Sequence, residues 1–442
     1  MEKLKEIWTY ISNNPLLSTV IGGLILAIIL AGITLLKGKR VNPSSPEGKL
    51  LKAQKLLSEG NAESANDLFS RIILENPDNK TLVSRALAGK AGTYLISGHE
   101  NPDRAIQYAT EAIMLIRENG NAYFYRGCAY YFKYEFEKAI EDFSEALEHG
   151  TLLKENSYME RGIFHFVMKS RDKAFSDFNE ALKHNPKSFF ALIWRAHAYL
   201  YRGEYDNAIK DYNKALKIDP KDDSSLVFRG SAYEIIGKYG KALSDYNKAL
   251  KIDPSNPITF CFRGSYFLKK EDYKHAFDDF NRALEIDPRN KIAYNERGEI
   301  YRNKGDYARA ISDFSKALEI DPAYSLAYIN RGKAYHEDEL YGSAIADYNK
   351  AIRIDPKNAD AYAGRAYIYF DMEDYDRAIA DCNQALEISR LSIDPHVIRA
   401  KSYCRQKNYD FAIEDCDWVL HFDPENTKAL EIRALAYAAK SI

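Results

Sequence analysis

The sequence predicts an all-α solenoid of stacked antiparallel helix pairs, preceded by one membrane-spanning helix. Three observations support this fold class: a period of 34 residues, a helical spacing of apolar residues within it, and an uncharged N-terminal segment. Ten arginines, each followed by Gly or Ala, mark the period, with a single gap of 35: Arg126, Arg161, Arg195, Arg229, Arg263, Arg297, Arg331, Arg365, Arg399 and Arg433. Such a period is typical of chains that hold other molecules.

The first 15 residues have the pattern of an amphipathic helix. Leu4, Ile7, Trp8 and Ile11 share one helical face, and Trp8 suits the headgroup region of a bilayer. We therefore expect residues 1–15 to lie along a membrane surface.

Residues 16–36 form an uncharged run of 21 residues, which is long enough to cross a hydrocarbon core of ~30 Å. The run is longer than the apolar core of a signal peptide and ends in Lys37, Lys39 and Arg40, so we interpret it as an uncleaved anchor. The excess of basic residues after the run favours a single-pass membrane protein with a cytoplasmic repeat domain. Residues 37–45 form a basic and Pro/Ser-rich linker.

The unit 325–358 illustrates the repeat when its arginine, Arg331, is numbered position 7. Gly332 at position 8 allows two helices to approach, and Tyr335 at position 11 fills the space between them. Pro356 at position 32 ends the second helix, because the residue before proline disfavours the α conformation. The apolar stripe of that second helix consists of Ala344 (position 20), Tyr348 (24) and Ala351 (27).

This spacing of small, aromatic, alanine and proline positions resembles the tetratricopeptide repeat (TPR) family from Pro46 to the C-terminus. Units such as DYNKALKIDP are similar to those of membrane-anchored prokaryotic TPR proteins. The resemblance implies a right-handed superhelix whose concave face is lined by the first helix of each pair. The repeats divide into two divergent copies in 46–119 (46–79 and 84–119), nine regular copies in 120–426, and a capping helix in 427–442.

Nine of the periodic arginines are followed 16 residues later by an aspartate, as Arg331 is by Asp347. A partly buried arginine needs a carboxylate partner, so we expect an ion pair within a repeat or to the next one. A row of arginines that grips an acidic ligand is the alternative.

The concave positions of the TPR family, 2, 5, 9, 12 and 13, provide the candidate partner-binding residues. In the early repeats these positions are apolar, whereas later ones carry polar residues such as Lys333, His336 and Lys401. An apolar groove of this kind would suit a hydrophobic or amphipathic peptide. The alternative is that the same stripe packs on the divergent repeats or tightens the superhelix locally. The candidates are Phe124, Cys128, Tyr131, Phe132, Met159, Ile163, Phe166, Phe190, Ile193, His197, Leu200 and Tyr201.

No motif for catalysis, cofactor binding or metal binding is evident, so we expect no enzyme activity and no cofactor. The five cysteines form no C-x-x-C pair, and the nine histidines show no metal-binding motif. The net charge of −2, with both signs mixed along the repeats, argues against a nucleic-acid partner.

These observations predict a membrane-anchored scaffold or adaptor that binds a protein or peptide in the concave groove of its superhelix. The alternative function is a receptor or chaperone-type component that handles unfolded or translocating polypeptides at the membrane. The sequence leaves the oligomeric state open.

Overall fold

The computed structural model describes residues 42–96 and 101–440. The predicted amphipathic segment 1–15, the predicted membrane helix 16–36 and residues 37–41 of the linker lie outside this part of the chain. Within the part that is described, none of the helices combines the length and the apolar character needed to span a bilayer.

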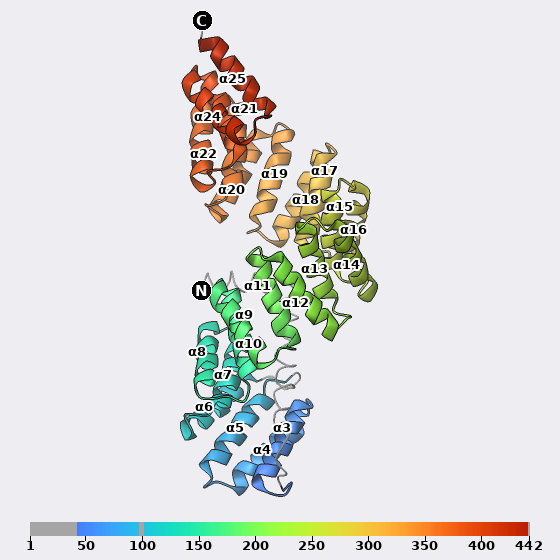
Figure 1. Cartoon of the computed structure of the whole chain (residues 1–442), viewed down its shortest axis with the longest axis vertical. Helices are drawn as coiled ribbons and strands as arrows, with labels where there is room; N and C mark the ends of the chain where they lie inside the picture. The colour runs from blue at the N-terminus through green and yellow to red at the C-terminus, as the bar shows by residue number, and fades with distance from the viewer. Residues whose placement is uncertain (1–41, 97–100, 441–442) are drawn as a thin grey trace. The chain divides into compact units, whose positions relative to one another are not determined.

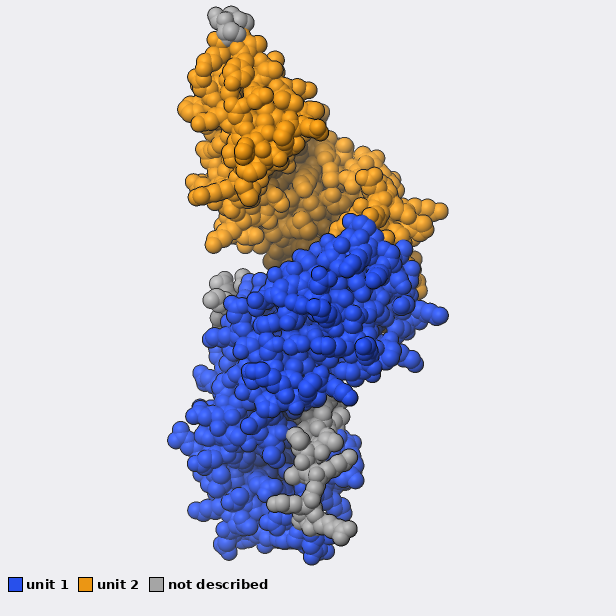
Figure 2. Space-filling model, viewed as in Figure 1, with its two compact units in different colours: residues 1–252 blue, residues 253–442 orange. Residues whose placement is uncertain are grey.

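The described residues form 23 helices, and contacts divide them into two units, residues 1–252 and 253–442 (Figures 1 and 2). Consecutive helices within each unit pack as pairs, as predicted for an all-α array. The helices of unit 1 are α3 (Pro46–Ser58), α4 (Ala62–Glu75), α5 (Lys80–Thr93), α6 (Pro102–Leu115), α7 (Gly120–Phe132), α8 (Phe136–Glu148), α9 (Lys154–Val167), α10 (Arg171–His184), α11 (Phe189–Tyr201), α12 (Tyr205–Ile218), α13 (Asp223–Ile235) and α14 (Tyr239–Ile252).

The helices of unit 2, like those of unit 1, are 13 or 14 residues long. Its helices are α15 (Pro257–Lys269), α16 (Tyr273–Ile286), α17 (Lys291–Asn303), α18 (Tyr307–Ile320), α19 (Ser325–Glu337), α20 (Tyr341–Ile354), α21 (Ala359–Asp371), α22 (Tyr375–Ile388), α23 (Ile393–Arg405), α24 (Tyr409–Phe422) and α25 (Thr427–Lys440).

Side-chain caps define where many of these helices begin. Asn290 Oδ1 accepts a hydrogen bond from the backbone N–H of Ala293 at 3.0 Å, at the start of α17. Asp306 Oδ1 accepts one from the N–H of Arg309 at 3.1 Å, at the start of α18. Each such bond satisfies a backbone donor that has no partner inside the helix. The sequence therefore sets the helix boundaries locally.

The second divergent repeat begins earlier than the sequence analysis placed it. We expected this copy to start at Ser84, whereas α5 starts at Lys80. Asn79 is the reason, because its side chain accepts a hydrogen bond from the N–H of Leu82 at 3.1 Å and caps the helix there.

The core of each repeat forms where an aromatic ring of the second helix enters a gap left by glycine on the first. Phe314 is fully buried, as are Ala310 and Ala317 on either side of it along α18. A Cβ atom at Gly298 would lie 2.7 Å from Cε1 of Phe314, closer than packed carbon atoms approach each other. Position 8 is therefore small because the aromatic ring at position 24 occupies the space.

Candidate functional site

The predicted Arg–Asp pairs all form, and each lies within one repeat. In every pair Nε of the arginine donates to Oδ2 of the aspartate and Nη2 donates to Oδ1, at distances of 2.6–3.0 Å. The aspartate side chains are only 3–9% exposed and the arginine side chains 15–22%. We call these pairs the arginine ladder; they are Arg126–Asp142, Arg161–Asp177, Arg195–Asp211, Arg229–Asp245, Arg263–Asp279, Arg297–Asp313, Arg331–Asp347, Arg365–Asp381 and Arg399–Asp415.

The ladder arginines also make a contact that we did not predict from the sequence, a hydrogen bond from Nη1 to the preceding repeat. Nη1 of Arg297 donates to Oδ1 of Asn281 at 2.7 Å, and Asn281 belongs to the second helix of the preceding repeat. Eight of the nine ladder arginines make such a contact, and each of these joins its own second helix to the one before it. The recurrence of Asn, Ser or Thr at position 25 could have revealed this contact. The acceptors seen are Thr110, Ser144, Asn179, Asn213, Asn281, Ser315, Asn349 and Asn383.

Aromatic rings flank the ladder on the first helices. The guanidinium of Arg331 lies 5.6 Å from the ring centre of Tyr328 and 5.7 Å from that of Tyr335, which is within cation–π range. Hydrogen bonding to Asp347 raises the pKa of Arg331 above its already high value, so this arginine stays protonated.

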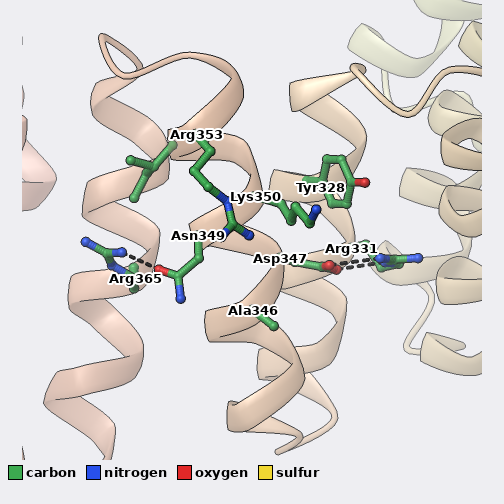
Figure 3. A pocket seen from close by; sticks show the side chains of 9 residues that line it. Tyr328, Arg331, Ala346, Asp347, Asn349, Lys350, Arg353 and Arg365 are labelled. Atoms are coloured by element: carbon green, nitrogen blue, oxygen red, sulfur yellow. Dashed lines mark hydrogen bonds and ion pairs between the residues drawn. The ribbon is translucent and has the colours of Figure 1, made fainter.

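A crevice of about 570 Å³ in unit 2 exposes part of the ladder (Figure 3). The close-up shows Arg331 directed at Asp347, and Arg365 directed at Asn349. The other two donor atoms of Arg365 are held by Asp381. Because these donors already have acceptors inside the array, the geometry favours the framework interpretation of the ladder over a grip on an acidic ligand.

The twelve candidate residues of the apolar groove divide into buried and accessible sets. Buried, with 0–8% exposure, are Phe124, Cys128, Met159, Ile163, Phe166 and Ile193. Tyr131, Phe132, Phe190, His197 and Leu200 are partly buried, and Tyr201 is 51% exposed. The buried six are part of the core in this structure and present little surface to a partner. The other six are the more accessible ones, and the groove in unit 1 stays a prediction.

The early stripe is buried because its aromatic side chains pack on one another across neighbouring first helices. Tyr131 on α7 meets Phe164 on α9, with ring centres 5.6 Å apart. Phe166 on α9 meets Trp194 and Tyr201 on α11, at 5.7 and 5.2 Å. The alternative interpretation, local tightening of the array, therefore describes this part of the stripe.

His197 is not a free imidazole in that region. Its Nδ1 lies 2.9 Å from the hydroxyl of Tyr212, and its ring lies edge-on to Phe228 with the centroids 4.5 Å apart. Burial lowers the pKa of His197 to about 4, so the ring is neutral at physiological pH. It serves packing rather than the recognition of a charged partner.

A second hollow, of about 340 Å³, opens on the first helices of unit 2. Nine of its twelve lining residues occupy predicted concave positions on α19, α21, α23 and α25. We call it the unit 2 groove; it is lined by Lys333, His336, Tyr348, Asp360, Ala363, Gly364, Tyr367, Asp394, Val397, Ile398, Lys401 and Lys428.

The charged side chains of the unit 2 groove differ from those of the ladder in having few partners. Lys333, Asp360, Asp394 and Lys428 make no ion pair or side-chain hydrogen bond with other described residues, and all four are exposed. Lys401 lies over the ring of Phe370, with Nζ 5.8 Å from its centroid. These groups are free to meet charges on a partner.

Two residues of the groove are held in place by neighbours. Nε2 of His336 lies 2.7 Å from Oδ2 of Asp371, on the next first helix. At Gly364 an added Cβ would collide with the ring of Tyr348 and lie 2.6 Å from its hydroxyl oxygen. The aromatic ring from α20 therefore reaches the floor of the groove because α21 has no side chain there.

Lys333, His336 and Lys401 occupy polar concave positions in the sequence, but they are not among the twelve predicted site residues. Three lysines and two aspartates line the same hollow because successive first helices stack side by side, which the sequence does not show directly. Among the described residues, no group of three or more His, Cys, Asp or Glu side chains could hold a metal ion.

Comparison with protein families finds matches to models of repeat families between residues 189 and 390. A model described as tetratricopeptide repeat matches residues 189–222, 225–256 and 359–390. Related models, described as TPR or tetratricopeptide repeats, match residues 259–290, 280–312, 298–338 and 341–373. No curated protein matches the chain in sequence.

The chain is also similar to solved structures, which include the following three. A tetratricopeptide repeat protein from Parabacteroides merdae is 24% identical over 57% of this chain and 99% of its own, with a TM-score of 0.46. Yeast Tom70 is 16% identical over 90% and 96%, with a TM-score of 0.47. A TPR protein from Thermus thermophilus is 23% identical over 41% and 99%, with a TM-score of 0.37.

Proposed function

Because the chain is a tetratricopeptide repeat protein, we propose that it is a scaffold that binds a protein or peptide segment in the unit 2 groove. Proteins of this family generally mediate protein–protein interactions. We assign this binding role to the unit 2 groove.

The contrast between two sets of cations supports the proposal. The ladder arginines are saturated by acceptors of the array, whereas Lys333 and Lys428 have no such acceptor among the described residues. Charges that the fold leaves unpaired at the wall of a hollow can form ion pairs with a ligand without first breaking internal ones. The groove therefore has charges available for recognition.

The arrangement of those charges indicates the chemistry of the bound segment. Position 9 carries Lys333, Tyr367 and Lys401 on three successive first helices, and Tyr367 is 41% exposed. A segment with an acidic side chain between the two lysines and an apolar side chain on Tyr367 would match this row. Asp360 and Asp394 at position 2 would favour a basic residue nearby.

A peptide selection tests this proposal. A random peptide library displayed on phage is selected against the full chain in detergent, and the affinity of each selected peptide is measured. We expect the double variant Lys333→Ala/Lys401→Ala to bind at least roughly tenfold more weakly, and Tyr367→Ala to lose a similar amount, because anchors of this kind dominate interfaces.

Lys350→Ala is the matched control, because Lys350 is also an exposed lysine of unit 2 but lies on the second helix α20. The control should bind as tightly as the unmodified chain. If all groove variants also retained full affinity, the unit 2 groove would not be the binding site.

The range of peptides that the chain binds distinguishes a scaffold from the alternative function, a receptor or chaperone-type component. A scaffold should select peptides that share one pattern of charges. A receptor or chaperone-type component should bind many unrelated apolar peptides with similar affinities.

We also propose that residues 16–36 anchor the chain in a membrane, because this segment is a run of 21 residues without a charge. We expect the full chain to resist extraction from membranes at alkaline pH and a chain lacking residues 1–40 to be released. With the expected cytoplasmic orientation, protease added to the outside of intact cells should leave the repeats uncut. Cleavage of the repeats under those conditions would show that the repeat domain lies outside the cell membrane, opposite to the expected orientation.

A further inference from the structure

Leu74 on α4 and Met114 on α6 are the most exposed large apolar side chains of the described residues, at 79% and 81%. Each is the penultimate residue of its second helix and follows a fully buried core residue, Ile72 or Ala112, by two positions. This is position 29 of the repeat, so the two divergent repeats expose apolar side chains where the regular repeats expose polar ones. The nine regular repeats carry a charged residue or histidine at position 29, which are Glu148, Lys183, Lys217, Lys251, Glu285, Glu319, Arg353, Glu387 and His421.

The ends of α4 and α6 lie on the edge of unit 1 at which the chain enters α3. Nζ of Lys49, in the first turn of α3, lies 2.5 Å from Oε2 of Glu75, so the last turn of α4 lies beside the beginning of α3. Oγ of Ser84, near the beginning of α5, donates to the carbonyl oxygen of Ala112 at 2.8 Å, so the last turn of α6 lies beside the beginning of α5. Only residues 76–79 connect α4 to α5. The two exposed apolar side chains therefore share this edge.

The apolar surface of this edge continues into the next repeat. Leu115 is 38% exposed, and Leu152, in the turn after α8, is 50% exposed. The backbone N–H of Leu152 donates to Oδ1 of Asn121 at 3.0 Å, which holds the turn beside the beginning of α7. Arg71 and Arg117, close in sequence to the exposed side chains, are themselves exposed and make no ion pair with other described residues. We call the surface the apolar edge; it consists of Leu74, Met114, Leu115 and Leu152.

We infer that the apolar edge contacts the surface of the lipid bilayer, an inference that rests on the proposed membrane anchor at residues 16–36. Residues 37–45 span at most about 30 Å, so an edge beside the beginning of α3 is within reach of the bilayer. Exposed leucine and methionine side chains can enter the boundary between headgroups and acyl chains, and nearby arginines can meet lipid phosphates. The apolar residues occur in the repeats nearest to the anchor along the chain, which a site for a soluble partner would not require.

Nitroxide spin labels test the contact in the full chain, reconstituted in vesicles of phosphatidylcholine and phosphatidylglycerol. Cys404→Ser is the background, because the other cysteines are buried. Power saturation compares collisions of the label with oxygen, which concentrates in lipid, and with a water-soluble nickel chelate. The ratio of oxygen to nickel collisions should be several-fold higher for a label on Met114→Cys than for one on Lys217→Cys. Lys217 is the matched control, since it is exposed at position 29 of α12 in the same unit.

The two collision rates and vesicle flotation distinguish the possible outcomes. Frequent nickel collisions at Met114→Cys would place the edge in water, and few collisions of either kind would show that protein covers it; both results overturn the inference. Flotation of the same samples tests the anchor. A chain that does not float with the vesicles would refute the anchor and the bilayer contact together. A chain that floats while its Met114→Cys label lies in water would refute the bilayer contact alone.

A double variant, Leu74→Glu/Met114→Glu, tests whether these two side chains hold the edge in lipid. A label on Leu152→Cys should report lipid in the otherwise unmodified edge and water in the double variant, because carboxylates are costly to place in a bilayer. The melting temperature should stay the same, since both substituted side chains are exposed. Lys217→Glu should leave the Leu152→Cys label in lipid. A label that stays in lipid in the double variant would contradict a contact made through Leu74 and Met114.

Discussion

Arg331 and Asp347 lie 16 residues apart and form a two-point ion pair, with Nε 2.7 Å from Oδ2 and Nη2 2.8 Å from Oδ1. The third donor of the same guanidinium, Nη1, reaches Ser315 of the preceding repeat at 2.9 Å. One side chain therefore connects three helices, α18, α19 and α20.

Removal of a ladder arginine should destabilise the protein without weakening peptide binding in the folded state. Arg297→Ala leaves Asp313, whose side chain is 5% exposed, without its charge partner. Loss of one partner from a buried pair costs about 3 kcal/mol, so the thermal transition followed by circular dichroism should move to lower temperature.

Arg309→Ala serves as the control for this change, because Arg309 pairs with Asp306 but its side chain is 67% exposed. Exposed pairs contribute about 0–1 kcal/mol, so the control should melt close to the unmodified chain. Equal effects of the two substitutions would contradict a structural role for the ladder.

The hydrogen bond between repeats that position 25 accepts should contribute less to the free energy of unfolding than the Arg–Asp ion pair. Asn281→Ala removes the acceptor of Arg297 Nη1 and should lower the free energy of unfolding by about 1 kcal/mol in a urea titration. Asn281→Ser should restore most of this, since Ser315 accepts the same bond from Arg331 at 2.9 Å. A serine variant as unstable as the alanine variant would show that the hydroxyl cannot replace the amide.

Gly364→Ala should destabilise unit 2 and reshape the groove floor. The new Cβ would collide with the ring of Tyr348, and overpacking of this kind costs about 1–3 kcal/mol. Gly342→Ala is the matched control on α20, because nothing lies within 4 Å of its added Cβ. Alanine favours helix over glycine by up to about 1 kcal/mol, so the control should melt slightly higher, and a lower melting temperature there would contradict the packing argument.

Stability should fall as the pH rises through the titration of Glu160. This carboxyl is 1% exposed, its Oε1 has no hydrogen-bond partner among the described residues, and burial raises its pKa to about 8 from an ordinary value of 4.5. Between these values the folded state keeps a proton that the unfolded state releases, so the free energy of unfolding decreases with pH. Burial raises the pKa of the Cys128 thiol and of the Tyr131 phenol, and the nearby Glu160 carboxylate adds to both shifts.

Glu160→Gln should remove this dependence. We expect the variant to melt a few degrees higher than the unmodified chain at pH 9 and close to it at pH 5, since glutamine is neutral throughout. Glu137→Gln, at an exposed position of α8, should change neither value. An unchanged pH profile in Glu160→Gln would mean that the carboxyl is ionised in the folded protein.

Much of the fold followed from spacing alone. The periodic arginines predicted helix pairs, and the regular first helices begin where the period places them, within one residue. The Ser84 start was wrong, since Asn79 caps α5 four residues earlier than the weak repeat pattern indicated. Irregular copies have fewer periodic residues, so a local cap outweighs the pattern.

The candidate site was harder to predict. The family positions lie on the first helices, but the sequence does not distinguish Phe166, which is 7% exposed, from Tyr201, which is 51% exposed. Both side chains are aromatic, and the difference arises from which neighbour covers each ring. The unpaired charges of the unit 2 groove are visible in sequence only as isolated lysines and aspartates.

The sequence by itself determined the helix pairs, their core positions and the Arg–Asp partners, because all three depend on distances along the chain within one or two helical hairpins. Only the tertiary structure decided which concave positions remain open. Large side chains such as Phe166 fill the space between neighbouring first helices in unit 1, whereas in unit 2 Gly364 admits Tyr348 to the floor of a hollow of about 340 Å³. That outcome depends on the combined volumes of side chains from several repeats, which no single period encodes.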